Sequence, residues 1–182
     1  MARLSGLASV ERLYRERGGR AYGEGVSQIE HALQCASLAQ ADGAAPSLIV
    51  AALVHDIGHL FEDEDAPARD HRHEAVGAAA LAGLFDEAVC APIALHVAAK
   101  RYLCFRERRY FAALSPASQA SLGLQGGAFD AAQAAAFRRL AYWREAVALR
   151  RLDDVAKSQE ACGRNFFEFL PVMRAVATAG AL

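Results

Sequence analysis

Residues 52–60 read ALVHDIGHL and place a histidine and an aspartate, His55 and Asp56, directly after a strongly apolar helical segment. A charged carboxylate in that position is costly unless a partner compensates for its lost hydration. A metal ion is one such partner and an arginine is another, and for a His-Asp pair taken alone we favour the arginine. The pair therefore becomes informative only through the residues that accompany it along the chain.

The segments around this stretch show helical periodicity almost everywhere. In the first half of the chain we expect a helix that ends at Gly18-Gly19, one from a capping box at 27–30 to about 42–43, one from Pro46 through 48–54, and one over about 73–85. A further helix is expected over about 86–96, with an interruption or kink near Pro92. The remaining helices are expected from Ser115-Pro116 to Gly123, over much of 131–157 after an Asp130 cap and with a break near Leu140, and over 166–177. No segment shows sustained strand alternation, and no repeat or linker divides the chain. The sequence predicts an all-α fold in a single domain over residues 1–182.

The bulk composition bounds the class of protein. The chain has 182 residues, of which 54% are apolar and 23% charged, which suits one compact domain with a sizeable core. Its 20 basic and 21 acidic residues give a net charge of −1. Nucleic-acid binding needs a concentrated basic face, so we expect no nucleic-acid partner.

Cysteine usage predicts a reducing compartment. Four cysteines, Cys35, Cys90, Cys104 and Cys162, are scattered without a CxxC pair, so neither a disulfide framework nor a thiolate zinc site is expected. We interpret them as small buried hydrophobic residues. The first 19 residues carry charges where a signal peptide would be apolar, and the longest uncharged runs are too short to span a bilayer. The expected location is the cytoplasm, away from any membrane.

Four more residues complete an ordered series with the His-Asp pair, each on its own predicted helix. The series H…HD…H…H…D consists of His31, His55-Asp56, His73, His96 and Asp153. It resembles the HD-domain superfamily, in which such a series builds a metal site at the centre of a helical bundle. The resemblance implies two metals bridged by Asp56, with His31, His55 and Asp153 completing one site and His73 and His96 the other.

The donor set itself restricts the metal. Imidazoles and carboxylates without thiolates suit Fe, Mn, Co or Ni better than a structural zinc site. Asp154 adjoins Asp153, and spacing alone leaves either of them as the ligand. The run 153–157, DDVAK, is similar to the D-x-x-x-K ending of di-iron HD oxygenases, which favours Asp153 and leaves Asp154 to orient a neighbour. His71 lies two residues from His73 and is interpreted as a surface residue.

Six segments resemble one branch of the superfamily, the mixed-valent di-iron oxygenases known from myo-inositol oxygenase and the phosphonate-cleaving PhnZ type. They are YGEGVSQIEHALQCA (22–36), ALVHDIGHL (52–60), HEAVGAAAL (73–81), LHVAAKRYL (95–103), LSPAS…SLGLQGG (114–127) and RRLDDVAK (150–157), so the resemblance covers about residues 22–169. It implies an Fe(II)/Fe(III) pair, O2 as co-substrate, and cleavage of the C–P bond of a 1-hydroxyphosphonate. With 2-amino-1-hydroxyethylphosphonate the products would be inorganic phosphate and glycine; a trimethylated relative would give glycine betaine.

Several residues outside the ligand series match substrate-holding positions of the PhnZ type. These are His59, Lys100, Ser118 and Arg150, which together would suit a phosphonate dianion. Lys100 is one of only two lysines and follows His96 by one helical turn, as His59 follows His55. Tyr22 and Glu24 resemble a gate over the iron, with Glu24 also able to meet a substrate ammonium. The ordinary alternatives are that Lys100 is a solvated surface lysine, that His59 is a histidine favoured at a helix C-terminus, and that Tyr22 is a loop tyrosine packed against the bundle.

Two other functions remain compatible with the core ligands. A metal-dependent phosphohydrolase acting on a nucleotide or phosphomonoester would use the same series. A degenerate HD module that senses a ligand would have lost members of the series, and all are present. The context of Lys100, LQGG and RRLDDVAK favours the oxygenase.

Overall fold

The computed structural model describes residues 4–22, 25–62 and 72–181. Within these ranges the chain forms ten α-helices and two short 3-10 helices: α1 (Leu7–Arg17), α2 (Gln28–Ala41), α3 (Pro46–Val54), η1 (Ile57–Phe61), α4 (His73–Leu81), α5 (Glu87–Arg106), α6 (Tyr110–Ala113), α7 (Pro116–Leu124), α8 (Ala131–Phe137), α9 (Trp143–Val155), η2 (Phe166–Phe169) and α10 (Leu170–Val176). Extended backbone in the described ranges is limited to two isolated bridges, Ala21 with Ser27 and Phe85 with Ala177. The predicted all-α class is confirmed.

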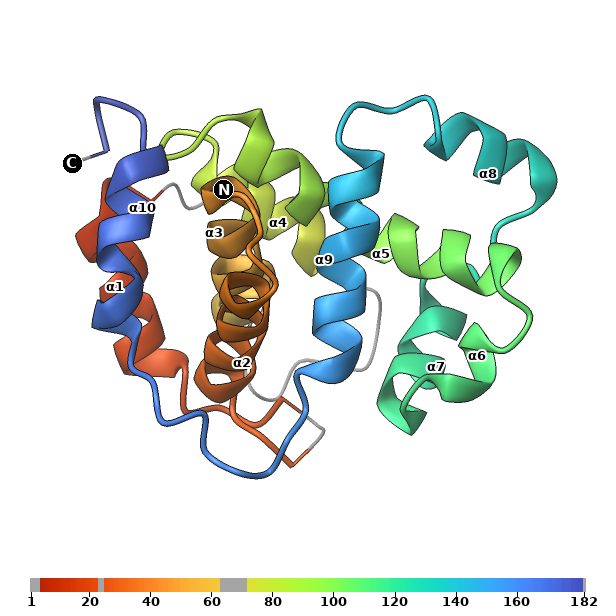
Figure 1. The fold of residues 1–182 in the computed structure, drawn as a ribbon, viewed down its shortest axis with the longest axis horizontal. Helices are drawn as coiled ribbons and strands as arrows, with labels where there is room; N and C mark the ends of the chain where they lie inside the picture. Colours follow the sequence, from red (N-terminus) through yellow and green to blue (C-terminus); the bar gives the residue numbers. More distant parts are fainter. Residues whose placement is uncertain (1–3, 23–24, 63–71, 182) are drawn as a thin grey trace.

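The apolar helix that precedes the His-Asp pair forms the centre of the main bundle. Residues 49–54 of α3 are all buried, because this helix is apolar on every face and has no side suited to water. Helices α2, α5, α9 and α10 pack against it, and α1 and α10 close one side of the bundle (Figure 1). The end of α3 therefore delivers His55 and Asp56 into the interior.

A second, smaller core lies beyond the main bundle. It is built from the C-terminal half of α5, the N-terminal half of α9, and α6 and α8, with Tyr102, Leu103 and Phe137 among its buried residues. In Figure 1, α6, α7 and α8 form a lobe on the far side of α5 and α9. These two long helices belong to both cores, so the residues midway along them lie between the bundle and the lobe.

Helix starts follow their predicted caps. Ser115 accepts a hydrogen bond from the Ser118 amide, and Asp130 forms a complete capping box with Gln133. Ser27 accepts from the Glu30 amide at 3.2 Å, but the expected capping box is only half formed. The Glu30 carboxylate instead accepts from the backbone amide of Cys162, which ties α2 to the segment after α9.

Two predicted helix boundaries are wrong. The helix expected to reach Phe85 ends at Leu81, and Phe85 pairs with Ala177 instead. Helix α5 runs as one element through Pro92 to Arg106, ten residues beyond the predicted end. Pro92 has no backbone N–H, so α5 lacks one hydrogen bond there. The turns of α5 that follow are buried in the second core, and the free energy of that burial exceeds the cost of the missing hydrogen bond.

Helix α5 is also long and apolar enough, by length and composition alone, to cross a membrane. Half of its most apolar window is buried inside the protein, as in the core helix of a globular domain. Its apolar character is accounted for by packing against α3, α4 and α9.

Gly58 lies directly after the His-Asp pair, and its lack of a side chain lets its backbone pack against the start of α4. A Cβ atom at this position would lie 2.0 Å from the carbonyl oxygen of His73, a backbone atom that cannot give way alone. We expect Gly58→Ala to lower the free energy of unfolding by about 3 kcal/mol, the upper range for overpacking, and to displace His73. Urea denaturation measures the first effect and metal content the second.

Gly83→Ala is the matched control, because a Cβ at that position meets nothing within 4 Å. Its stability should stay within about 1 kcal/mol of the wild type. Equal effects of the two substitutions would contradict the steric account of Gly58.

Candidate metal and substrate site

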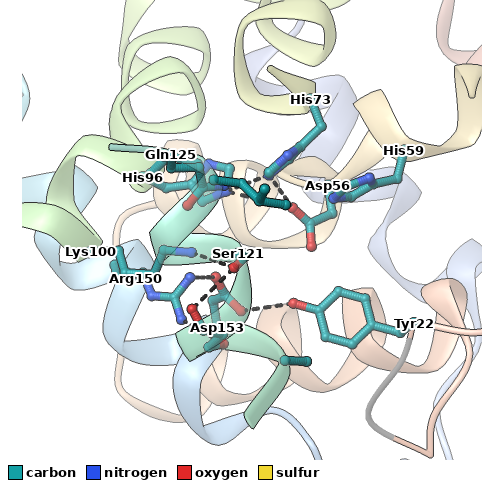
Figure 2. Close-up of a pocket in the computed structure, with 14 residues that line it drawn as sticks. Tyr22, Asp56, His59, His73, His96, Lys100, Ser121, Gln125, Arg150 and Asp153 are labelled. Carbon is teal, nitrogen blue, oxygen red and sulfur yellow. Dashed lines mark hydrogen bonds and ion pairs between the residues drawn. The ribbon is translucent and has the colours of Figure 1, made fainter. Parts of the chain in front are cut away.

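Six buried side chains from five helical segments converge at the centre of the protein. They are His31 from α2, His55 and Asp56 at the end of α3, His73 at the start of α4, His96 from α5 and Asp153 from α9. Figure 2 shows Asp56, His73, His96 and Asp153 around one cavity. The structure thus brings together every residue of the predicted ligand series, although the segments that carry them span more than 120 positions of sequence.

The first group of donor atoms surrounds His31 and His55. Their Nε2 atoms lie 3.3 Å apart. Asp153 Oδ1 lies 3.5 Å from His31 Nε2, and Asp56 Oδ2 lies 3.3 Å from His55 Nε2. Two imidazole nitrogens and two carboxylate oxygens therefore face a common point.

The second group surrounds His73 and His96, whose Nε2 atoms lie 3.1 Å apart. Asp56 Oδ1 lies 3.4 Å from His73 Nε2 and 3.6 Å from His96 Nε2. Asp56 therefore turns one oxygen to each group, the arrangement of a bridging carboxylate.

Backbone contacts orient the imidazoles so that Nε2 points inward as a lone pair. In three histidines Nδ1 lies within hydrogen-bond distance of a carbonyl oxygen: His31 with Ala156 at 2.7 Å, His55 with Ala52 at 3.0 Å, and His96 with Ile93 at 2.7 Å. A carbonyl oxygen accepts only, so Nδ1 carries the proton and Nε2 is free to bind a metal. Two Nε2 atoms 3.1–3.3 Å apart repel each other unless a proton or a metal cation lies between them.

Asp56 gives an independent test of whether the site fits metal ions. Its Oδ1 is buried and has no hydrogen-bond partner among the described residues, which is costly for a carboxylate. Two ligands at about 2.1 Å from one octahedral ion lie about 3 Å apart, close to the spacings in both groups. The residues fit two metal ions that share Asp56.

Opposite charges inside the cluster shift its titration. Burial raises the pKa of Asp56, but His55 and His73 outweigh burial and hold that pKa well below its usual range. Burial lowers the pKa of His55, but Asp56 and Asp153 raise it overall to about 9. Burial dominates at His96 and lowers its pKa to about 4. The carboxylates are therefore ionised and available as ligands.

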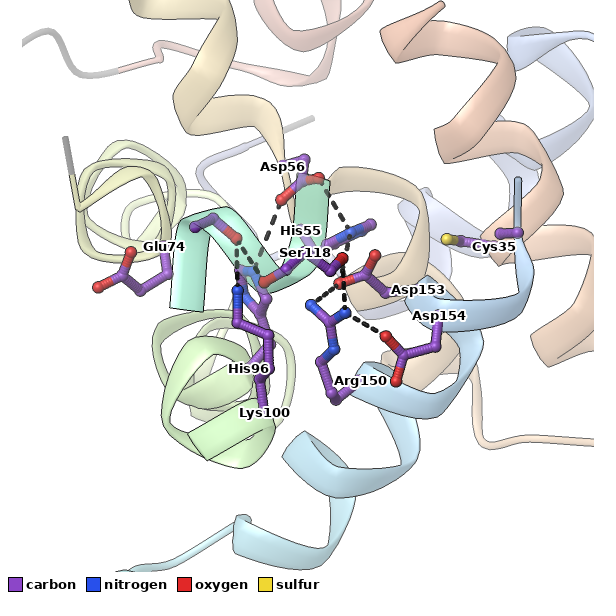
Figure 3. Close-up of polar contacts among 12 residues, drawn as sticks. Cys35, His55, Asp56, Glu74, His96, Lys100, Ser118, Arg150, Asp153 and Asp154 are labelled. Carbon is purple, nitrogen blue, oxygen red and sulfur yellow. Dashed lines mark hydrogen bonds and ion pairs between the residues drawn. The ribbon is translucent and has the colours of Figure 1, made fainter. Parts of the chain in front are cut away.

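Of the two adjacent aspartates, the structure places Asp153 in the cluster and Asp154 outside it. Asp153 is 1% exposed and faces His31, as given above. Asp154 accepts a hydrogen bond from the Tyr110 hydroxyl. It accepts another from the Arg150 guanidinium (Figure 3). Asp154 thus orients Arg150, the role left open for it by the sequence.

A cavity of about 200 Å³ opens over the second group of donors. All four predicted substrate contacts line this cavity: His59, Lys100, Ser118 and Arg150. Tyr22 and four of the six cluster residues line it as well, namely Asp56, His73, His96 and Asp153. Two further polar residues, Ser121 and Gln125, belong to the wall and were not predicted as substrate contacts. The position of Ser121 depends on how α7 lies beside α5, where it accepts a hydrogen bond from Lys100, and no local pattern reveals this contact.

The cavity gathers buried positive charge. Lys100 is 3% exposed and donates to Ser121 Oγ at 2.8 Å. Burial, together with the neighbouring Arg150, lowers the pKa of Lys100 to about 8. Arg150 donates to Asp153 Oδ2 at 2.6 Å and lies 3.4 Å from Ser118 Oγ.

Lys157, the other lysine, also reaches this wall and was not predicted as a contact. Its ammonium donates to Ser118 Oγ at 3.1 Å and to Ser115 Oγ at 3.3 Å. The scarcity of lysine in the chain was a usable signal, because both lysines follow ligand residues by four positions.

Tyr22 and His59 cover the cluster from opposite sides. The Tyr22 ring stacks on His31 with centroids 3.9 Å apart, and its hydroxyl donates to Asp153 Oδ1 at 3.1 Å. The His59 ring stacks on His73, also at 3.9 Å. His59 belongs to the 3-10 helix η1 and not to a regular turn after His55, yet it reaches the cavity. Glu24 and His71 lie outside the described residues.

Comparisons with known proteins identify the family to which the chain is similar. The family model for the HD domain matches residues 29–119. Hydroxymethylphosphonate dioxygenase from Gimesia maris is 47% identical over 156 residues, covering 83% of this chain and 78% of the relative. The [1-hydroxy-2-(trimethylamino)ethyl]phosphonate dioxygenase (glycine-betaine-forming) from Leisingera caerulea is 37% identical over 169 residues, covering 89% and 85%.

The buried Lys100 should leave a signature in stability. Its pKa of about 8 in the folded state lies below the value of 10.5 for a free lysine, so folding penalises the charged form. We expect Lys100→Met to be more stable than wild type at pH 7, by up to about 3 kcal/mol, with the gap shrinking between pH 8 and 10.5. Urea unfolding of metal-free protein at pH 7 and pH 10 measures this gap. A gap that does not change with pH would contradict the burial of a charged lysine.

Proposed function

Because the chain belongs to the HD-domain family and, within it, to the hydroxyphosphonate dioxygenases of the PhnZ type, we propose that it cleaves the C–P bond of a 1-hydroxyphosphonate with O2. The products are inorganic phosphate and a carboxylic acid. One observation carries this proposal: a cluster built for two metal ions forms the floor of a cavity whose wall is cationic.

We assign the metal sites residue by residue. His31, His55 and Asp153 hold one ion, His73 and His96 hold the other, and Asp56 bridges them, as the donor spacings support. We propose that both ions are iron, as an Fe(II)/Fe(III) pair. When bound, they supply the site of O2 activation and carry the electrons of the oxidation.

The phosphonate group is held by the wall of the cavity. Lys100 and Arg150 supply positive charge, and Ser118 and His59 supply hydrogen bonds. Because these cations are buried, their attraction to a dianion is weakly screened by water. Asp154 and Tyr110 keep the Arg150 guanidinium in place, since both contact it directly.

Orientation follows from where these groups lie relative to the metal cluster. A phosphonate held at Lys100 and Arg150 places its C1 carbon and hydroxyl toward the cluster floor, where His96 and Asp56 line the same cavity. Tyr22 covers the first group of donors and limits the access of water from that side. The protein thus contributes positioning and electrostatics to the reaction.

Hydroxymethylphosphonate is the first substrate to test, since the relative that is 47% identical is named for it. One O2 and one hydroxymethylphosphonate balance to one formate and one phosphate without an external reductant. By the same balance 2-amino-1-hydroxyethylphosphonate gives glycine and phosphate. For that substrate we propose Glu24 as the partner of the ammonium group and Tyr22 as the gate. We assign the enzyme to the cytoplasm, which its four free cysteines favour.

The activity test compares aerobic and anaerobic reactions of iron-loaded protein. We expect phosphate release from a 1-hydroxyphosphonate with O2 consumed in equal amount, and none without O2. Electron paramagnetic resonance should detect a coupled Fe(II)/Fe(III) pair. Phosphate release from a phosphomonoester under anaerobic conditions, with no O2 uptake on phosphonates, would show a phosphohydrolase instead.

The two adjacent aspartates provide a matched pair for the metal assignment. Asp153→Asn should lose one of the two irons, because it removes the carboxylate that faces His31. Asp154→Asn should keep both irons but raise KM about tenfold, since it weakens a charged hydrogen bond that holds Arg150. Metal analysis and steady-state kinetics separate the two effects. Loss of iron from Asp154→Asn with retention in Asp153→Asn would reverse the assignment.

A further inference from the structure

A cysteine thiol lies beside the first group of donor atoms. Cys35 follows His31 by one turn of α2 and is fully buried. Its Sγ atom lies 3.7 Å from His31 Nε2, the nitrogen that faces His55. In Figure 3 Cys35 stands next to α9, on the side of the cluster that holds Asp153. The sequence alone suggested only a small apolar filler at this position.

The spacing of these donors matches a tetrahedral site for a soft ion. With Zn–N near 2.0 Å and Zn–S near 2.3 Å, two nitrogens lie about 3.3 Å apart and a nitrogen and a sulfur about 3.5 Å apart. The two histidine nitrogens are 3.3 Å apart and the His31 nitrogen is 3.7 Å from the sulfur. The donor atoms of His31, Cys35 and His55 all lie within 4.8 Å of one another.

We propose that the first site has a second mode of metal binding, in which Zn²⁺ is held by Cys35, His31, His55 and Asp153. Asp153 Oδ1 lies 3.5 Å from His31 Nε2 but outside the group of three donors that all lie within 4.8 Å of one another, so its side chain turns toward the ion to become the fourth donor. A thiolate favours zinc over the harder ions that suit carboxylate-bridged sites. Binding displaces the thiol proton into solvent, so the ion exchanges one proton for one Zn–S bond.

This second mode goes beyond C–P cleavage and opposes it. Zinc has no redox chemistry, and a tetrahedral set that uses Cys35 has no need of the Asp56 bridge. Zinc at this position therefore competes with iron for His31, His55 and Asp153. The ratio of available zinc to iron then sets the fraction of active enzyme.

The test uses Co²⁺ as a spectroscopic substitute for zinc. Titration of Co²⁺ into the full-length metal-free protein should produce a sulfur-to-cobalt charge-transfer band in the near ultraviolet. Cys35→Ala should abolish this band and weaken Zn²⁺ binding about 100-fold in competition with a chromophoric chelator. Cys35→Ser, which keeps the side-chain volume, should give the same loss of the band if Cys35→Ala folds poorly.

Cys162→Ala is the control, because the Cys162 thiol contacts Ser37 and lies outside the donor cluster. It should retain the band in full. A wild-type protein without the band, or a band that persists in both Cys35 variants, would overturn the proposal. No step of this test uses O2 or a phosphonate, so its failure and the failure of C–P cleavage are separate results.

Discussion

The electrostatic demand of Asp56 organises the rest of the molecule. Its carboxylate lies among four imidazole Nε2 atoms, and one of its oxygens has no hydrogen-bond partner among the described residues. Such an assembly is costly unless protons or metal cations lie between these atoms, so the free energy of metal binding also stabilises the folded bundle. The apolar α3 brings Asp56 into the interior, and the backbone carbonyls that hold Nδ1 atoms keep the imidazoles aimed at the same points.

Much of this arrangement was predictable because its signals are local. Caps at Ser115 and Asp130 mark helix starts. The six cluster residues were predicted instead from the resemblance of the ordered series to the HD-domain superfamily, and all six are buried. The remainder depends on contacts between distant segments. Residues 97–106 are helical because they complete a second core, and Ser121 reaches the cavity because α7 lies beside α5 and contacts Lys100. Spacing alone left Asp153 and Asp154 open and only the resemblance of the run DDVAK favoured Asp153, whereas in the structure Asp153 faces His31 and Asp154 contacts Arg150.

The cationic wall shows why a near-neutral protein can bind a dianion. Lys100 and Arg150 are both buried, so their charge acts on the cavity and contributes little to the surface. Arg150 is balanced by Asp153 and Asp154, whereas Lys100 has its pKa lowered by burial and by Arg150. The charged form of Lys100 is destabilised by burial, and an anionic group bound in the cavity would offset that cost.

The separation of the two cores has a consequence for how such enzymes diversify. The metal cluster is anchored mainly in the large core, while α7, which lies in the lobe beside the small core (Figure 1), supplies the far wall of the cavity. Substitutions in the lobe can reshape the space around a substrate while the packing that fixes the donor atoms stays unchanged. The two relatives are named for hydroxyphosphonates of quite different bulk. A cavity wall that changes independently of the metal cluster is consistent with that difference. The bundle fixes the donor atoms, and substitutions in the lobe can change which substrate the cavity accepts.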